Sequence, residues 1–151
     1  MEYYDQIADG YDELYKEEQL EKVKIILENI KPKGLLLDVG AGSGISTKPF
    51  EKFCTCIAFD ASWELLKRYN GYKMLGKAEE MPFPDNYFDV IISVTALHHC
   101  DVKKALKEIE RVGKKDVQIA ISILKKSKVE LELFKGFNRI DSEKDWIFVK
   151  S

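Results

Sequence analysis

Three glycines at alternate positions and one aspartate are the residues of this chain whose types and spacing suit the binding of a nucleotide-like ligand. Gly40, Gly42 and Gly44 follow directly on the largely apolar run of residues 35–39. Glycine permits positive φ and lets a ligand approach the backbone closely, and the N–H groups of such a loop and of a helix start can receive its polar end. Asp60 ends a second apolar run, where a carboxylate can accept hydrogen bonds from ribose hydroxyls. The alternative is that Asp60 only caps the helix that follows it.

The spacing of the glycines disfavours a dinucleotide as that ligand. The dinucleotide fingerprint is Gly-x-Gly-x-x-Gly, whereas residues 40–44 read Gly-Ala-Gly-Ser-Gly and are followed by Ile45 and Ser46. An NAD enzyme is therefore the weakest of the enzyme hypotheses.

Alternating helices and strands are predicted to position these residues. Hydrophobic patterns predict strands over 35–39, 54–59, 72–75, 88–94 and 117–124, and a closing hairpin over 137–140 and 146–149. Helices are predicted over 17–30, 62–69 and 102–112, with short helices after the glycines and over 129–134. Such alternation is typical of a mostly parallel sheet with right-handed crossovers.

Residues 37–44, Leu-Asp-Val-Gly-Ala-Gly-Ser-Gly, resemble the first motif of the class I S-adenosylmethionine-dependent methyltransferases, in their small-molecule and ubiquinone-biosynthesis-like branch. Further segments match that branch in the same order, namely residues 4–12, 59–62, 78–91, 93–99 and 105–112. The resemblance implies an α/β fold of the Rossmann-like three-layer sandwich type, with a mostly parallel seven-stranded sheet and one antiparallel edge strand from a C-terminal hairpin. It also implies S-adenosylmethionine as the cofactor and S-adenosylhomocysteine as its product.

The resemblance assigns a role to each part of the cofactor site. It places the methionine moiety on the glycine loop, with Asp38 at its amino end and Asp60 at the ribose. The backbone of residues 78–79 faces the adenine, residues 93–94 lie under the methionine, and Tyr11 closes over the cofactor. The cofactor-binding residues implied in this way are Asp38, Gly40, Ala41, Gly42, Gly44, Asp60, Ala61, Ala78, Glu79, Ser93, Val94 and Tyr11.

Two positions near this site leave alternatives open. The family often has Asp before the Ala-Glu pair, accepting from the adenine amino group, whereas this chain has Lys77, which can only donate. We expect Glu79 or a backbone carbonyl to accept instead. His98 and His99 are candidate general bases, because imidazole titrates near neutral pH. In the alternative, one histidine packs against or caps the loop before Asp101 and the other lies in solvent.

The sequence narrows the range of candidate methyl acceptors but does not identify one. Residues 93–96, Ser-Val-Thr-Ala, stand where enzymes that methylate planar amide or nucleobase amino groups typically have Asn-Pro-Pro-Tyr, so those acceptors are disfavoured. The His-His segment also resembles a wobble-uridine tRNA methyltransferase group, whose members can need a small activating partner. The net charge of −2 disfavours RNA and favours a small-molecule acceptor. A second hypothesis is a cofactor-binding regulatory or non-catalytic subunit, with a homodimer or a small partner completing the site.

Length and composition fit one compact unit. The chain has 151 residues, of which 45% are hydrophobic and 33% charged. We expect a single S-adenosylmethionine-dependent methyltransferase domain over residues 1–151, with a helical cap over 1–33 and a Rossmann-like core over 34–151. No apolar run approaches the roughly 20 residues that span a bilayer, and the charged N-terminus is no signal peptide, so we expect a cytoplasmic protein without membrane contact. The three cysteines are too few and wrongly spaced for a zinc site, so no metal is expected.

Overall fold

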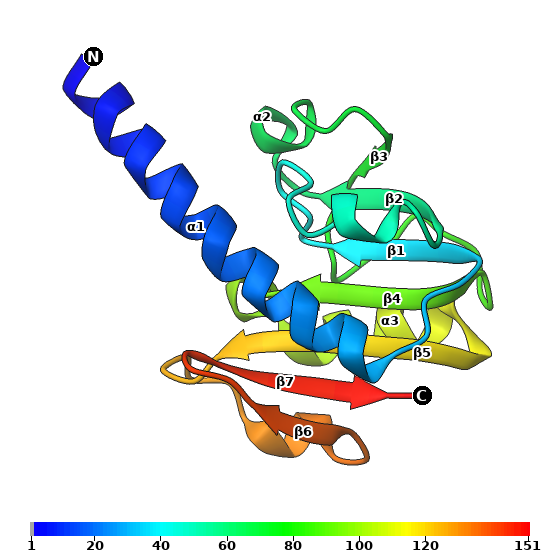
Figure 1. The fold of residues 1–151 in the computed structure, drawn as a ribbon. Coiled ribbons are helices and arrows are strands. Elements are labelled where there is room, and N and C mark those ends of the chain that lie inside the picture. The colour runs from blue at the N-terminus through cyan, green and yellow to red at the C-terminus, as the bar shows by residue number, and fades with distance from the viewer. Residues whose placement is uncertain (1) are drawn as a thin grey trace.

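Seven strands form one sheet in the order β3-β2-β1-β4-β5-β7-β6 in a computed structural model, which describes the backbone of residues 2–151 and the side chains from residue 13 onward (Figure 1). The strands are β1 (Leu35–Val39), β2 (Thr55–Asp60), β3 (Tyr72–Leu75), β4 (Phe88–Val94), β5 (Gly113–Leu124), β6 (Asn138–Asp141) and β7 (Asp145–Lys150). The helices are α1 (Glu2–Asn29), α2 (Trp63–Leu66) and α3 (Val102–Val112), with 3-10 turns η1 (Lys48–Phe50), η2 (Leu97–His99) and η3 (Leu131–Phe134).

The sheet is mostly parallel, as the sequence predicts. Strands β3, β2, β1, β4 and β5 pair in parallel, whereas β7 pairs antiparallel with both β5 and β6. The C-terminal hairpin therefore supplies the antiparallel strand, and β7 lies between β5 and the edge strand β6. Because the chain runs outward from β1 to β3 and then crosses to β4, the strand order reverses between β1 and β4. Open α/β sheets bind ligands outside the carboxyl ends of the strands at such a reversal.

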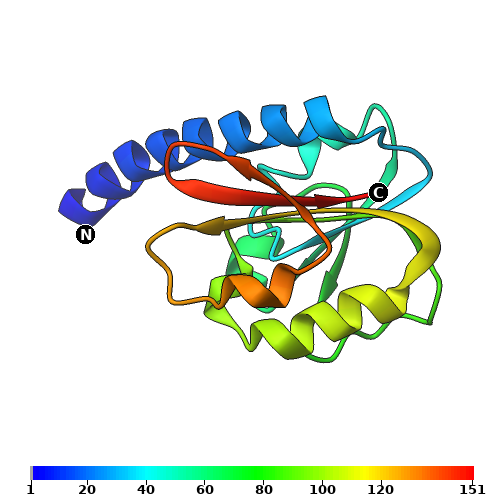
Figure 2. The same ribbon diagram turned by 90° about the horizontal axis from the view of Figure 1, so that it is seen from below.

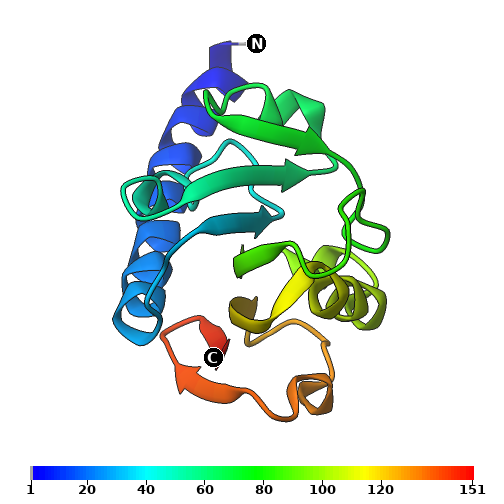
Figure 3. The same cartoon turned by 90° about the vertical axis from the view of Figure 1, so that its right-hand side faces the viewer.

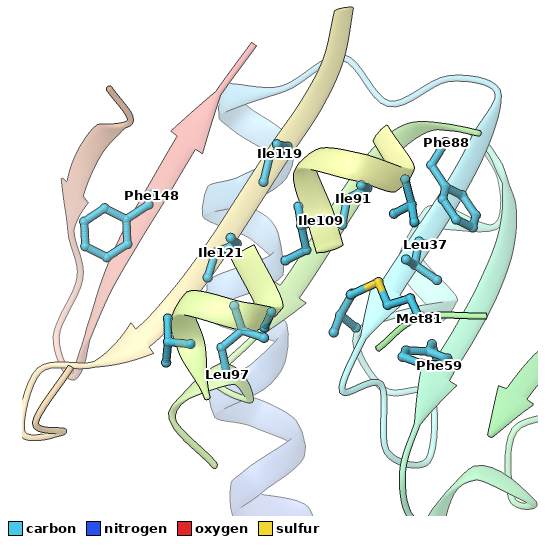
Figure 4. Packing of buried hydrophobic residues seen from close by; sticks show 14 of the residues in the cluster. Leu37, Phe59, Met81, Phe88, Ile91, Leu97, Ile109, Ile119, Ile121 and Phe148 are labelled. Atoms are coloured by element: carbon cyan, nitrogen blue, oxygen red, sulfur yellow. The ribbon is translucent and has the colours of Figure 1, made fainter. Parts of the chain in front are cut away.

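Helices cover both faces of the sheet and make it the middle of three layers (Figures 2 and 3). On one face, Val23 and Ile26 of α1 pack against Leu36 and Ile92. On the other face, α3 buries a stripe at helical spacing, which the sequence predicts, onto β4 and β5 (Figure 4). That stripe comprises Val102, Ala105, Ile109 and Val112.

Three elements differ in length from the prediction. Helix α1 begins at Glu2 rather than at residue 17, because the helix continues beyond the part in which Val23 and Ile26 pack on the sheet (Figure 1). Helix α2 ends at Leu66 rather than at residue 69, since the chain turns to bury Tyr69 against the bare Cα of Gly44. Strand β5 begins at residue 113, where the glycine that ends α3 has extended backbone angles.

The crossover from β3 to β4 contains no helix in the structure as described. Residues 76–87 form a loop instead, with one isolated bridge between Lys77 and Glu80. None of the helices in the described part of the chain is long and apolar enough to span a bilayer.

Candidate functional site

A cleft of about 1350 Å³ opens at the carboxyl ends of the parallel strands, where the strand order reverses. Pockets for one small ligand usually measure about 300–1000 Å³, so this cleft has room for a cofactor and a second molecule. It is lined by the glycine loop, the end of β2, the loop after β3, the segment after β4, residues 13–22 of α1, and residues 124–126 with Lys144.

The glycine loop is tied to the end of β2 and exposes its backbone to the cleft. The N–H groups of Gly40 and Ala41 both donate to the carbonyl of Phe59, at 2.8 and 3.1 Å. A Cβ atom on Gly40 would lie 2.3 Å from Cβ of Ala96, and its φ of +75° also favours glycine. A Cβ atom on Gly42 would meet only Leu65, at 3.9 Å. The loop is therefore packed tightly at Gly40, against Ala96, whereas there is open space around Gly42.

Asp60 lies in the cleft wall and already holds two backbone N–H groups. Its Oδ2 accepts from Gly42 at 2.9 Å, and its Oδ1 accepts from Ser62 at 2.8 Å. The N-cap of α2 is Ser62, whose hydroxyl accepts from Leu65, so Asp60 braces the cap and does not itself form it. An ionised carboxylate offers about four acceptor positions. Asp60 can therefore accept two further hydrogen bonds from a ligand.

Asp38 is fully buried beneath the glycine loop and does not line the cleft. Its Oδ2 accepts from the hydroxyls of Ser46 and Thr47, at 2.6 and 2.8 Å, whereas Oδ1 has no hydrogen-bond partner in the described part of the chain. Burial raises the pKa of Asp38 to about 7, although the two hydroxyls lower it. Asp38 thus fixes the turn after the glycines to β1 and leaves one buried oxygen free to accept.

The loop after β3 carries Ala78 and Glu79 into the cleft wall, and α3 clamps this loop from outside. Arg111 donates to the carbonyls of Phe83 and Met81 at 2.8 and 2.9 Å. Glu108 accepts from the Met81 N–H at 2.8 Å and from Arg111, and this arginine lowers the pKa of Glu108. Ala61, on the exposed turn after β2, also lines the cleft.

Glu79 and Lys77 stand at the same end of the cleft. Glu79 accepts weakly from the Asp101 N–H, at 3.2 Å, which leaves acceptor positions on its carboxylate.

Ser93 and Val94 are buried below the cleft floor, and the next two residues line it. The Ser93 hydroxyl donates to the Val39 carbonyl at 2.8 Å and so joins β4 to β1. The Val94 carbonyl accepts from the Gln19 side chain of α1 at 3.1 Å. Tyr11 lies outside the residues whose side chains the structure describes.

His98 and His99 lie side by side in η2 and both line the cleft. Their ring centroids are 4.0 Å apart. Nδ1 of His98 is buried without a hydrogen-bond partner among the residues whose side chains the structure describes. Burial lowers the pKa of His98, His99 and Lys22 lower it further, and Asp145 acts in the opposite direction. Burial therefore favours the neutral form of His98, which can accept a proton.

Sequence reasoning missed a buried polar cluster at this end of the cleft, formed by Lys22, Thr95 and Asp145. Nζ of Lys22 lies 3.2 Å from Oδ1 of Asp145 and donates to the Thr95 hydroxyl at 2.7 Å. Thr95 has an unusual backbone conformation, with a left-handed φ of +54°. No pattern in the sequence indicates this conformation, so the cluster could not be found from the sequence.

Comparison with known proteins shows the class to which this chain belongs. A family model described as a methyltransferase domain matches residues 37–121. The chain belongs to this methyltransferase family, which confirms the resemblance drawn from its motifs, and a solved structure described below shares the Rossmann-like fold.

Curated relatives match most of this chain, and one of them is named a methyltransferase. The uncharacterized protein MJ1252 of Methanocaldococcus jannaschii is 38% identical over 122 residues, which are 76% of this chain and 47% of that protein. The ubiquinone/menaquinone biosynthesis C-methyltransferase UbiE of Burkholderia mallei is 33% identical over 126 residues, which are 73% of this chain and 50% of UbiE. The chain thus spans about half the length of these relatives.

Solved structures share the fold at lower identity. A SAM-dependent methyltransferase from Aquifex aeolicus matches with a TM-score of 0.71 and 20% identity, over 85% of this chain and 87% of that one. A chain of the complex between the Haloferax volcanii Trm112 methyltransferase activator and a methyltransferase matches with a TM-score of 0.74 and 18% identity, over 89% of this chain and 75% of that one.

Proposed function

We propose that this chain is an S-adenosylmethionine-dependent methyltransferase that acts on a small-molecule acceptor. The observation that carries the proposal is the cleft at the strand reversal, with an open glycine backbone and Asp60 on one side and His98 and His99 on the other. The relative UbiE is named for a C-methyltransferase of quinone biosynthesis, which supports a small molecule. In this proposal residues 34–151 are the catalytic core and residues 1–33 its helical cap.

The residues of the cleft fit the cofactor chemically. The open cleft side of Gly42 accommodates a ligand where a side chain would intrude, and Asp60 retains acceptor positions for ribose hydroxyls. Asp38 lies beneath the loop and outside the cleft wall, so we assign to it the support of the loop that would receive the amino end of the cofactor. The residues proposed to hold the cofactor, or to support from below the backbone that holds it, are Asp38, Gly40, Ala41, Gly42, Gly44, Asp60, Ala61, Ala78, Glu79, Ser93, Val94 and Tyr11.

When bound, S-adenosylmethionine supplies a methyl group that its sulfonium has already activated. The protein then has to hold an acceptor atom in line with that methyl group, about 3–3.5 Å away. We assign the orientation of the donor to the glycine loop and Asp60. Neutral His98 is placed to take a proton from an acceptor hydroxyl or amine, with His99 beside it.

An RNA acceptor with an activating partner is the second candidate. It is favoured by one observation, the similarity to a chain of the complex that contains the Trm112 activator. The net charge of −2 speaks against it, because RNA binding relies on clustered cations.

Calorimetric titration with S-adenosylhomocysteine, S-adenosylmethionine and NADH tests the cofactor assignment. Binding of the two sulfur compounds but not of NADH is the expected result, and its absence would contradict the proposal. Radiolabelled methyl transfer to quinols, small phenols, amines and bulk tRNA then separates the candidates. Labelling of tRNA alone would replace the small-molecule proposal, and cofactor binding without any turnover would favour a non-catalytic subunit.

A further inference from the structure

Lys22, Thr95 and Asp145 form a closed polar cluster from three distant parts of the chain. Lys22 comes from α1, Thr95 follows β4, and Asp145 begins β7. Asp145 is completely buried, and only 9% of the Lys22 side chain is exposed. The Thr95 hydroxyl accepts from Lys22 at 2.7 Å and donates to Oδ2 of Asp145 at 2.8 Å. Because the desolvation of a buried ion pair is costly, this pair is weak evidence for a stabilising role. Its position beside the cleft suggests a role in the geometry of the cleft instead.

The backbone of Thr95 supplies the second observation. Its φ of +54° is unfavourable for a β-branched residue and persists only where the surroundings impose it. Its N–H donates to the carbonyl and to the hydroxyl of Ser122 on β5, at 3.0 and 2.9 Å. Thr95 is therefore fixed twice: its backbone N–H is bonded to Ser122 of β5, and its side-chain hydroxyl is bonded to Lys22 and Asp145.

The segment that Thr95 controls forms the acceptor side of the cleft. Ala96 packs against Gly40, and its carbonyl accepts from the N–H of His99 at 3.2 Å. The same cluster docks α1, since Oε1 of Gln19 lies 3.4 Å from Nζ of Lys22 and the other end of that amide holds the carbonyl before Thr95. One cluster thus fixes both the turn that bears the histidines and the helix that faces them.

We propose that the Lys22–Thr95–Asp145 cluster is a positioning device that sets the acceptor side of the cleft, an inference that rests on the proposed methyltransferase function. Lys22 lines the cleft, but its Nζ is engaged by oxygens of Gln19, Thr95 and Asp145. In this proposal Lys22 and Asp145 are positioning residues that act through Thr95. The ion pair holds Thr95 in its strained conformation, and Thr95 in turn aims the 96–99 turn.

Paired variants test this role in the ligand-free protein. Thr95→Ala removes the hydroxyl that joins the cluster, whereas Thr95→Ser keeps it. The double variant Lys22→Met/Asp145→Asn removes both charges together, so that neither is left buried alone. Glu21→Gln is the control, because Glu21 lies on α1 at an exposed position outside the cleft.

Two readouts report the position of the turn. The chain contains only two histidines, so ¹⁵N–¹H spectra of the imidazoles resolve His98 and His99 directly. We expect Thr95→Ala and the double variant to shift both sets of signals, and to speed amide exchange over residues 95–99 by about tenfold, equivalent to about 1.4 kcal/mol of local stability. Thr95→Ser and Glu21→Gln should match the wild type.

The outcomes are distinct. Unchanged histidine signals and exchange in Thr95→Ala would overturn the proposal, and this comparison decides even if the double variant does not fold. Calorimetry with S-adenosylhomocysteine should give the double variant an affinity within about threefold of wild type, because the glycine loop and Asp60 are untouched. A loss above tenfold would make the cluster part of the cofactor site and overturn it. Failure of the wild type to bind would instead reject the proposed function, since the spectra need no ligand.

Discussion

Replacement of Asp60 is the sharpest test of the cofactor site, because the structure gives this carboxylate two separable roles. Both of its oxygens accept from backbone N–H groups, at 2.9 Å from Gly42 and 2.8 Å from Ser62. Asp60→Ala removes these acceptors and also the two that remain for ribose. Hydrogen bonds to charged groups make a net contribution of about 1.5–3 kcal/mol each when buried. Because Asp60 is only half-buried, solvent screening reduces this, and we expect a loss of about 1–3 kcal/mol in protein stability.

The same substitution should weaken binding of S-adenosylhomocysteine by about 10- to 100-fold, which corresponds to about 1.4–2.8 kcal/mol. Asp60→Asn should lose as much, because its amide offers one acceptor to two backbone donors and turns an NH₂ group toward the other. Isothermal titration calorimetry measures the affinity, and thermal unfolding measures the stability separately. Asp116→Asn, at an exposed position of β5, is the control.

An affinity in Asp60→Ala within about twofold of wild type, accompanied by a lower melting temperature, would refute the reasoning. Asp60 would then only brace the start of α2, as the simpler interpretation of the sequence has it.

Further predictions concern the groups around the cleft. The pKa of Asp38 is raised to about 7 in the folded state, above its value in the unfolded chain, so between about pH 4 and 7 the folded state binds more protons. The free energy of unfolding should therefore decrease as the pH rises from about 4 to 7, by up to about 1.4 kcal/mol per pH unit. Urea unfolding across this range should show the slope, and Asp38→Asn should remove it. Gly44→Ala should unfold at least several degrees lower on heating, because its Cβ would lie 2.2 Å from the Tyr69 ring at a φ of +89°. Arg111→Met should speed amide exchange in the loop after β3, and protection equal to wild type would show that the clamp contributes nothing. His98→Ala should lower methyl transfer by about 10²–10⁴-fold once an acceptor is known, with cofactor affinity retained in calorimetry; lost affinity would make the histidine structural.

Local sequence patterns predicted the central part of the fold accurately and its long-range connections poorly. The apolar runs at 35–39 and 88–94 became β1 and β4 with the expected bounds, because strands buried on both faces are apolar throughout. The hairpin was evident from its turn, but the insertion of β7 beside β5 depends on pairing between segments that no local pattern links. The early end of α2 depends likewise on Tyr69 filling the space above Gly44.

The candidate site likewise contains some residues that local sequence motifs predict and others that only the three-dimensional structure reveals. Its glycine loop and Asp60 are contiguous motifs and were found from the sequence, and the structure brings them into one cleft. Lys22 and Asp145 went unnoticed because a lysine on a helix and an aspartate beside a polar turn are ordinary surface residues in sequence. Only the arrangement of α1 over β4 and β7 buries them together.

The meeting of α1 with β7 has a consequence for synthesis of the protein. A ribosome makes Lys22 early and Asp145 more than a hundred residues later, so the counter-charge of the lysine does not exist while β1 to β5 emerge. Until β7 is made, α1 can cover the sheet through Val23 and Ile26, but the acceptor side of the cleft stays unfinished. The cleft is therefore completed only when β7 pairs with β5, and a nascent chain that lacks β7 cannot assemble the whole site.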